Sequence, residues 1–186
     1  DIKPGNIMLC RHGGAFDVVK VLDFGLVKDV ASGDQAALTH ADAMVGTPLY
    51  LSPEAITGPS RVSARSDLYA VGGVGYFLLA GRPVFDGETV AEVCARHLYE
   101  PPVPPSTFES VPADLEALVL ACLDKSPERR PADARALREA LLACATAGDW
   151  TPAEARRWWQ SHGAPVPEEL AVAPTLPGHR VPAQPA

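Results

Sequence analysis

The sequence has 186 residues and a mass of 19.6 kDa, which is enough for one domain with its own core. Apolar residues make up 47% and charged residues 21%, a globular composition that excludes a wholly disordered chain. The formal net charge of -7 lacks the basic surplus typical of proteins that bind nucleic acids or anionic membranes, so we expect no nucleic-acid partner.

The first elements in chain order form a predicted β-hairpin. Two short β-branched runs, at 7–10 and 18–22, flank a loop that contains Gly13 and Gly14, and this pattern is typical of antiparallel strands. Residues 26–52 then show no periodicity and are interrupted by glycine and proline, which predicts a long loop of the kind that is usually functional.

From Ser66 onward the chain is predicted to be mainly helical. Thr89 and Glu92 form a capping box that predicts a helix through about Leu98, after which the proline-rich residues 100–105 predict an extended connector. Two further helices are predicted from apolar residues at helical spacing. Their stripes are Leu115, Leu118, Val119 and Cys122 in the first, and Leu137, Leu141 and Cys144 in the second.

The last part of the chain has a different character. Thr151 and Glu154 form another capping box, which predicts a short helix within a Trp-rich extension over residues 148–163. We expect the three tryptophans of this extension to cap the helical part of the molecule, with a docking surface for a partner as the alternative. Residues 164–186 are rich in proline and alanine, which is typical of a linker or disordered tail.

Cysteine spacing and hydropathy indicate the compartment. The cysteines at 10, 94, 122 and 144 are too far apart for a metal-binding pair or a disulfide framework, so a reduced, cytoplasmic location is expected. The longest apolar run, at 68–80, is shorter than the roughly 20 residues of a transmembrane helix and predicts a buried helix. The chain opens with Asp1 inside a motif, so we interpret it as a fragment of a longer protein. We expect that protein to carry a sensor or other domain, and a membrane anchor is compatible with this interpretation.

The opening D-I-K-P-G-N carries chemistry. It places the Asp1 carboxylate, the Lys3 ammonium and the Asn6 carboxamide on one short loop, and the predicted hairpin would return the chain to this loop at Asp23. Oxygen donors from Asn6 and Asp23 suit Mg²⁺, which completes its coordination with phosphate oxygens and water. A metal, a lysine and a carboxylate are together what phosphoryl transfer requires.

Five motifs then carry a family resemblance. They are D-I-K-P-G-N at 1–6, D-F-G at 23–25, V-G-T-P-L-Y-L-S-P-E at 45–54, S-D-L-Y-A-V-G at 66–72 and L-D-K-S-P-E-R-R-P at 123–131. In this order they resemble the catalytic loop, metal-binding motif, activation-segment end, central helix and late arginine motif of protein kinases. The sequence is identified as similar to the bacterial, eukaryote-like (Hanks-type) serine/threonine kinases. The implied fold is the mainly α C-terminal lobe, residues 1–147, with a small β-hairpin at the cleft and an activation segment over 23–54.

The resemblance implies roles in binding and catalysis. Asp1 matches the catalytic base, Lys3 would lie between it and the transferring phosphate, and Thr47 matches a threonine that hydrogen-bonds both. Asn6 and Asp23 match the Mg²⁺ ligands, with Mn²⁺ as a substitute. The implied substrates are ATP and protein Ser or Thr hydroxyls, because Lys3 and Thr47 both match the serine/threonine class rather than the tyrosine class.

The resemblance also implies a residue under the adenine ring, several structural residues and a phosphorylation site. Met8 would form the floor under adenine, and Phe24 would pack into the hydrophobic spine that sets active or inactive geometry, with Gly25 as a further structural residue of the same motif. Thr39, with Ser32 as the weaker candidate, lies where such kinases are often autophosphorylated. Two structural roles concern the helical part: a buried ion pair of Glu54 with Arg130, and the anchoring of the catalytic loop by Asp67.

Some parts of the family pattern are missing from the sequence. It has no Gly-rich loop, no ATP-pairing lysine with its glutamate, and no His-Arg before Asp1. Since these parts make most of the phosphate contacts, we expect the chain alone to be inactive and its parent to be an active kinase. The alternative is a truncated, pseudokinase-like module that binds partners without phosphoryl transfer.

Overall fold

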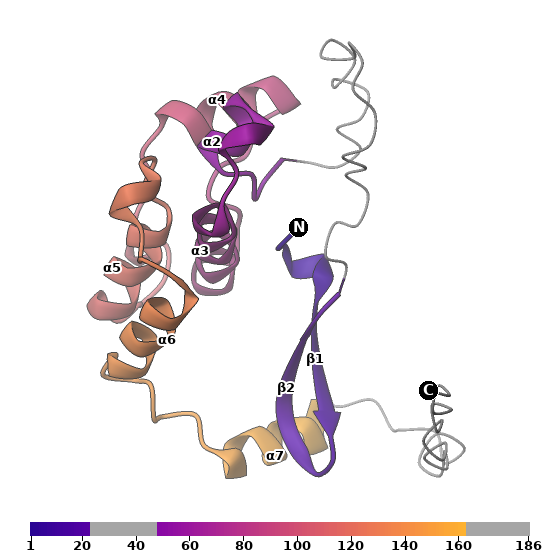
Figure 1. The fold of residues 1–186 in the computed structure, drawn as a ribbon. Coiled ribbons are helices and arrows are strands. Elements are labelled where there is room, and N and C mark those ends of the chain that lie inside the picture. The colour runs from indigo at the N-terminus through magenta and orange to yellow at the C-terminus, as the bar shows by residue number, and fades with distance from the viewer. Residues whose placement is uncertain (23–47, 163–186) are drawn as a thin grey trace, which may run out of the picture.

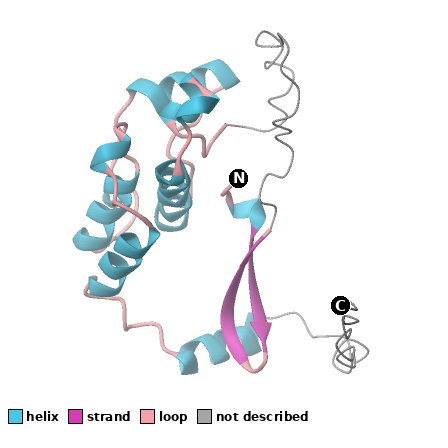
Figure 2. Ribbon diagram, viewed as in Figure 1, coloured by secondary structure: helices cyan, strands magenta, loops and turns pink. Residues whose placement is uncertain are grey.

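The computed structural model describes residues 1–22 and 48–162 of the chain. Within these ranges, helices α2 to α6 form one group, and a two-stranded hairpin lies beside them with helix α7 across its far end (Figure 1). Figure 2 shows that the hairpin supplies the strands of the described part and that everything else is helix, turn or connector. This is the mainly helical architecture with a small hairpin that the sequence predicts.

The hairpin pairs β1 (Ile7–His12) with β2 (Ala15–Val21) in antiparallel register, with Ile7 opposite Val21. Gly13 and Gly14 make the turn, and both have positive φ (57° and 83°), a region that glycine enters without steric cost. The register slips between Cys10 and His12, where Arg11 of β1 stands opposite both Phe16 and Asp17, so β2 carries one extra residue. The predicted hairpin is confirmed, and the strands extend closer to the turn than the β-branched runs suggest.

The helices of the main group follow their predicted order. α2 covers Pro53–Thr57 and α3 covers Ala64–Ala80, while the remaining three are α4 (Val90–Tyr99), α5 (Ala113–Cys122) and α6 (Ala134–Ala143). Four short 3-10 turns connect or precede them, each opening with proline: Pro4–Asn6, Pro59–Arg61, Pro105–Thr107 and Pro127–Arg129. None of the described helices combines the length and hydropathy of a bilayer-spanning segment.

Capping side chains fix where the helices begin. The Thr89 hydroxyl accepts a hydrogen bond from the Glu92 N–H (3.1 Å), as the capping box predicts. The Glu92 carboxylate accepts instead from the N–H of Glu88 (3.0 Å), one residue earlier than the pattern predicts. α3 begins two residues before Ser66, because the Ser63 hydroxyl caps it and the Ser66 hydroxyl accepts a hydrogen bond from the Ser63 N–H (3.1 Å). This Ser-Ser box was not among the predicted caps.

The apolar stripes are only partly buried. Val119, Cys122 and Leu137 lie in the core, whereas Leu141 remains 39% exposed and Cys144 lies just beyond α6 as its C-terminal cap. The prediction that Cys144 continues the helix is therefore wrong. The chain turns away there because Cys144 adopts extended backbone angles.

The core is built on α3. Its tyrosines Tyr69 and Tyr76 pack with Val119 and Leu123 of the α5 region, with almost no exposure to solvent. The Tyr76 hydroxyl donates to the Val103 carbonyl (2.8 Å), which satisfies its polar group at the extended connector. Gly72 of α3 allows the closest approach to α5, because a Cβ atom there would lie 2.7 Å from Cβ of Cys122.

Helix α7 (Pro152–His162) begins at the predicted capping box, with the Thr151 N–H bonded to Glu154 (2.7 Å) and the Glu154 N–H to Thr151 (3.3 Å). It packs against β2 rather than against the group of helices. The expectation that the tryptophans cap the helical lobe is therefore wrong, because the indole N–H groups of Trp150 and Trp159 donate to Asp17 on the hairpin.

The approach of α3 to α5 gives a first prediction. Gly72→Ala should lower the free energy of unfolding by about 1–3 kcal/mol, because the added methyl overpacks the contact with Cys122 more than the gain in helix propensity offsets. Urea denaturation measures the change. Gly58→Ala is the control, since a Cβ there meets nothing within 4 Å, and an equal loss in both variants would contradict the packing argument.

Candidate active site

The residues of the predicted catalytic loop, 1–6, form one hydrogen-bonded cluster. Pro4–Asn6 makes a single 3-10 turn, closed by a hydrogen bond from the Asn6 N–H to the Lys3 carbonyl (3.0 Å). This turn carries the side chain of Asn6 back over the start of the chain. Its carboxamide N–H donates to the Asp1 carboxylate (3.0 Å) and to the Asp1 carbonyl (2.8 Å).

Lys3 reaches the same carboxylate. Its ammonium lies 2.5 Å from Asp1 Oδ2, and both side chains are nearly half exposed. The structure thus brings Asp1, Lys3 and Asn6 together at the start of the hairpin. A carboxylate held by two donors has a fixed orientation and keeps further lone pairs for a substrate hydroxyl.

The hairpin ties the end of β2 to this cluster. The N–H of Leu22 donates to the Asn6 carbonyl (2.7 Å), so the chain returns to the catalytic loop at the residue before Asp23 in the sequence. Because the Asn6 amide nitrogen is engaged with Asp1, its Oδ1 is left as the ligand atom. Mg²⁺ binds amide oxygens, so Asn6 is a suitable ligand for the predicted ion.

Several predicted site residues lie outside the described ranges. These are Asp23, Phe24, Gly25, Ser32, Thr39 and Thr47, and their roles stay predictions. Within residues 1–22 and 48–162, no group of three or more His, Cys, Asp or Glu side chains could hold a metal ion. Met8 lies on β1 with its side chain 48% exposed, opposite Lys20.

Asp67 lies in the first turn of α3 and is exposed. Among the hydrogen bonds of the described residues, none joins its side chain to the catalytic loop. Its anchoring role stays a prediction.

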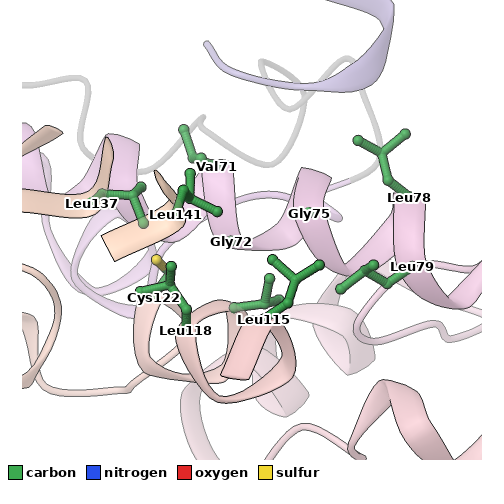
Figure 3. A pocket seen from close by; sticks show the side chains of 11 residues that line it. Val71, Gly72, Gly75, Leu78, Leu79, Leu115, Leu118, Cys122, Leu137 and Leu141 are labelled. Atoms are coloured by element: carbon green, nitrogen blue, oxygen red, sulfur yellow. The ribbon is translucent and has the colours of Figure 1, made fainter. Parts of the chain in front are cut away.

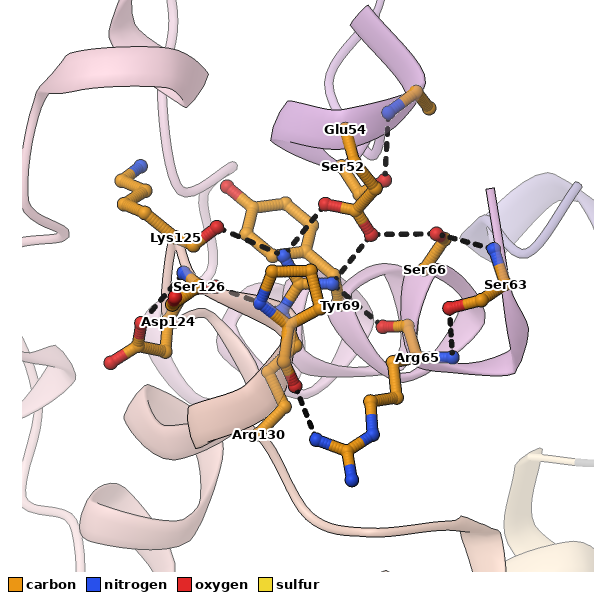
Figure 4. A network of polar contacts seen from close by, with 12 residues as sticks. Ser52, Glu54, Ser63, Arg65, Ser66, Tyr69, Asp124, Lys125, Ser126 and Arg130 are labelled. Carbon is orange, nitrogen blue, oxygen red and sulfur yellow. Dashed lines mark hydrogen bonds and ion pairs between the residues drawn. The ribbon is translucent and has the colours of Figure 1, made fainter. Parts of the chain in front are cut away.

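The strongest polar contact of the helical group is the ion pair of Glu54 with Arg130 (Figure 4). Two parallel hydrogen bonds of 2.7 and 2.8 Å join the guanidinium and the carboxylate. The side chains are buried, with 0% of Arg130 and 7% of Glu54 exposed. Sequence spacing alone places these residues far apart, and only the family resemblance paired them.

Further acceptors satisfy the rest of the Arg130 guanidinium. It donates to the backbone carbonyls of Asp124 (2.8 Å) and Arg65 (2.8 Å), and it lies over the Tyr69 ring at 4.9 Å. On the other side, the Ser66 hydroxyl donates to Glu54 (2.6 Å). Every hydrogen-bonding position that this buried pair needs is therefore occupied, which is the condition under which a buried ion pair is tolerated.

The same contacts explain the charge of Glu54. Burial raises its pKa, but the hydrogen bonds from Arg130 and Ser66 outweigh this and lower the pKa to about 2. The carboxylate stays ionised throughout the neutral and mildly acidic range. Ser66 was singled out only as part of a motif, and the Ser-Glu hydrogen bond gives it a structural reason.

A buried histidine lies behind the ion pair. His97 of α4 is fully buried, and its Nδ1 lies 2.8 Å from the Tyr69 hydroxyl. Burial, together with the nearby positive charge of Lys125, lowers the His97 pKa to about 4, against a smaller opposing effect of the Leu49 backbone. The Lys125 ammonium donates to the His97 carbonyl (2.7 Å) and lies 4.4 Å from the centre of the Phe85 ring.

An apolar cavity of about 240 Å³ lies between α3, α5 and α6 (Figure 3). Its walls are aliphatic, with Val71, Leu79, Leu118 and Leu141 among them. The one reactive group in the lining is the thiol of Cys122, whose pKa burial raises to about 11. The thiol is thus protonated at neutral pH, and we assign this cavity to packing rather than to catalysis.

Comparison with known proteins gives the family. The family model of the protein kinase domain matches residues 1–142. Serine/threonine-protein kinase PknB of Mycobacterium leprae is 43% identical over 143 residues, which cover 76% of this chain and 22% of that protein. Two kinases of Myxococcus xanthus, Pkn1 and pkn3, are 40% and 38% identical over 178 and 191 residues.

These two alignments cover 95% and 96% of this chain, but 25% and 35% of the relatives. The chain therefore spans between about a fifth and about a third of the length of the curated relatives it matches. The chain belongs to the protein kinase family, in which the cited relatives are bacterial serine/threonine kinases.

The buried ion pair gives a second prediction. Arg130→Ala should lower the free energy of unfolding by about 3–5 kcal/mol, because it leaves the Glu54 carboxylate buried without its partner. The matched control is Arg129→Ala, which removes a 71% exposed partner of Asp124 and should cost less than about 1 kcal/mol. Equal losses in urea denaturation would show that the buried pair has no special weight.

The titration of His97 gives a third. Its folded pKa of about 4 lies below the usual value of about 6.5, so neutral His97 contributes stability that is complete above pH 6.5. This contribution is lost as the pH falls from 6.5 through 4, and the Glu54 contribution is lost further down, from about pH 4.5 through 2. Unfolding free energies measured between pH 7 and pH 4 should therefore fall with a slope that His97→Gln removes.

The exposed His12 is the matched control for that slope. His12→Gln should leave the pH dependence unchanged. A slope that persists in His97→Gln would assign the acid sensitivity to other groups.

Proposed function

We propose that this chain supplies the catalytic loop and the helical lobe of a serine/threonine protein kinase, which transfers the γ-phosphoryl group of ATP to protein Ser or Thr hydroxyls. The observation that carries the proposal is the cluster of Asp1, Lys3 and Asn6, with Asp1 Oδ2 at 2.5 Å from Lys3 and 3.0 Å from Asn6. The family membership and the printed names of the relatives support the reaction class.

Each member of the cluster has a distinct task. Asp1 orients the acceptor hydroxyl and takes its proton, and Lys3 holds this carboxylate while offering positive charge to the transferring phosphoryl group. Asn6 contributes Oδ1 to magnesium, with Asp23 as the second protein ligand. When bound, the metal neutralises phosphate oxygens.

The remaining assignments concern specificity and organisation. Lys3 and Thr47 favour Ser and Thr over Tyr as acceptors, and Met8 forms the floor of the adenine site. We divide the chain into a kinase lobe over 1–147, a Trp-rich extension over 148–163 and a tail over 164–186. The partners are Ser- and Thr-containing proteins in the cytoplasm.

A fourth prediction tests the base. In the full-length gene product that carries this chain, Asp1→Asn should lower kcat for phosphoryl transfer to casein by about 10²–10⁴-fold. The KM for Mg-ATP should change little, because Asp1 acts on the acceptor hydroxyl. Phosphoamino-acid analysis should show phosphoserine and phosphothreonine.

Glu139→Gln on the exposed face of α6 is the matched control and should keep the wild-type rate. Undiminished transfer in Asp1→Asn would refute the assigned base. A wild-type protein that binds its partners but transfers no phosphate would establish the alternative, a binding module of the pseudokinase kind.

A further inference from the structure

One carboxylate fastens the C-terminal extension to the hairpin. Asp17 of β2 accepts two indole N–H hydrogen bonds, from Trp150 to Oδ2 and from Trp159 to Oδ1, each of 2.7 Å. The two tryptophans come from either end of the extension, one just before α7 and one within it. Together these three residues form what we call the Asp17 clamp.

The backbone of β2 is shaped for this contact. Asp17 has φ of +56°, and it is the one residue other than glycine with positive φ in the described part of the chain. Asp tolerates this left-handed region better than most residues, yet a left-handed residue is uncommon within a strand. This conformation occurs at the β-bulge itself, where Phe16 and Asp17 of β2 stand opposite Arg11 of β1, so the strand pairing is irregular where β2 meets α7.

Two cation–aromatic contacts flank the clamp in a reciprocal arrangement. Arg11 of β1 lies over the Trp159 ring of α7, and Arg156 of α7 lies over the Phe16 ring of β2, both at 5.6 Å. Each element thus supplies a cation to an aromatic ring of the other. The contact is specific in chemistry and does not rest on apolar burial alone.

The hairpin by itself has few stabilising contacts. A two-stranded hairpin is at best marginally stable by itself in water. Here Met8, Leu9 and Val19 are each about half exposed, and α7 is the described helix that packs against β2. The end of the hairpin opposite α7 carries Asn6, which is bonded to Asp1 and receives the Leu22 N–H.

The extension is itself fastened to the helical group. Asp114 at the start of α5 accepts the Ala145 N–H (2.7 Å), and the turn that follows is closed by the Asp149 N–H on the Thr146 carbonyl (3.1 Å). A continuous series of contacts therefore runs from α5 through residues 144–151 and α7 to the hairpin. It gives the hairpin a second attachment besides the chain itself.

We propose that Asp17 is a positioning residue: by clamping Trp150 and Trp159 it lets the C-terminal extension brace the hairpin, and so holds Asn6 in place over Asp1. The effect on nucleotide use rests on the proposed function, because Asn6 and Met8 belong to the nucleotide and metal side of that site. Loosening the clamp should weaken Mg-ATP binding more than it slows the chemical step.

The clamp can be observed without any enzymatic assay. The sequence contains three tryptophans, all in the extension, and Asn6 is its single asparagine. A ¹⁵N–¹H spectrum of the 186-residue chain therefore reports the clamp through three indole N–H signals, and the catalytic loop through one asparagine carboxamide pair. Asp17→Gly, which deletes the carboxylate but accepts the positive φ, should shift two indole signals and the Asn6 pair.

Trp158→Phe is the matched control, because Trp158 stacks on His162 at 5.0 Å and meets Trp159 edge-on at 5.5 Å. Its removal should delete the third indole signal and shift that of Trp159, but leave the Trp150 signal and the Asn6 pair unchanged. Asp17→Asn keeps the left-handed backbone and one acceptor, so it should give smaller shifts in the same signals, beside one new carboxamide pair from the introduced asparagine. This variant guards against a misfolded glycine variant. Unchanged indole signals in Asp17→Gly would overturn the clamp. Shifted indole signals with an unmoved Asn6 pair would overturn the positioning role.

Kinetics of the full-length gene product provide the second readout. Asp17→Gly should raise the KM for Mg-ATP by about tenfold and change kcat by less than about threefold, a split that a general loss of folded protein does not give. Trp158→Phe should keep both constants. An unchanged KM would overturn positioning, whereas a wild type without phosphoryl transfer would overturn the proposed function and leave the spectrum to decide on Asp17.

Discussion

The ion pair of Glu54 with Arg130 is the interaction on which the helical group depends. It joins α2 to the turn before α6, and the extra hydrogen bonds of Arg130 add the start of α3 and the end of α5 to the same point. A buried pair of this kind is costly unless every donor and acceptor is used. Its geometry therefore specifies one arrangement of four segments, because a shift of any of them would leave a buried charge unsatisfied.

The apolar core follows from that arrangement. With the first turn of α3 fixed by Ser66 and by the Arg65 carbonyl, Tyr69 lies against the guanidinium and reaches His97. One turn further along, Gly72 brings α3 against Cys122. The polar contacts at the start of α3 thus fix how the rest of the helix packs against α5. The same group of residues makes the stability of the domain sensitive to acid, through His97 and Glu54.

Local signals in the sequence predicted most of the fold. The β-branched runs on either side of Gly13 and Gly14 predicted the hairpin, and the caps at Thr89 and Thr151 predicted two helix starts, because these features depend on near neighbours. The sequence did not predict the capping box at Ser63. Two predictions were wrong: that α6 continues to Cys144, and that the extension with α7 packs on the helical group. The last depends on Asp17, more than 130 residues away in sequence, and no spacing rule connects it to the tryptophans.

For the candidate site, residues in one short loop could be placed together from the sequence, whereas the return of the chain toward Asn6 before Asp23, the predicted second metal ligand, depends on the hairpin. The hydrogen bond from Leu22 to Asn6 fixes the chain just before the predicted activation segment, and the ion pair of Glu54 fixes it again at the last residue of that segment. Described contacts therefore hold the chain on both sides of residues 23–47. The Asp17 clamp braces the hairpin, which is the holding element on the N-terminal side.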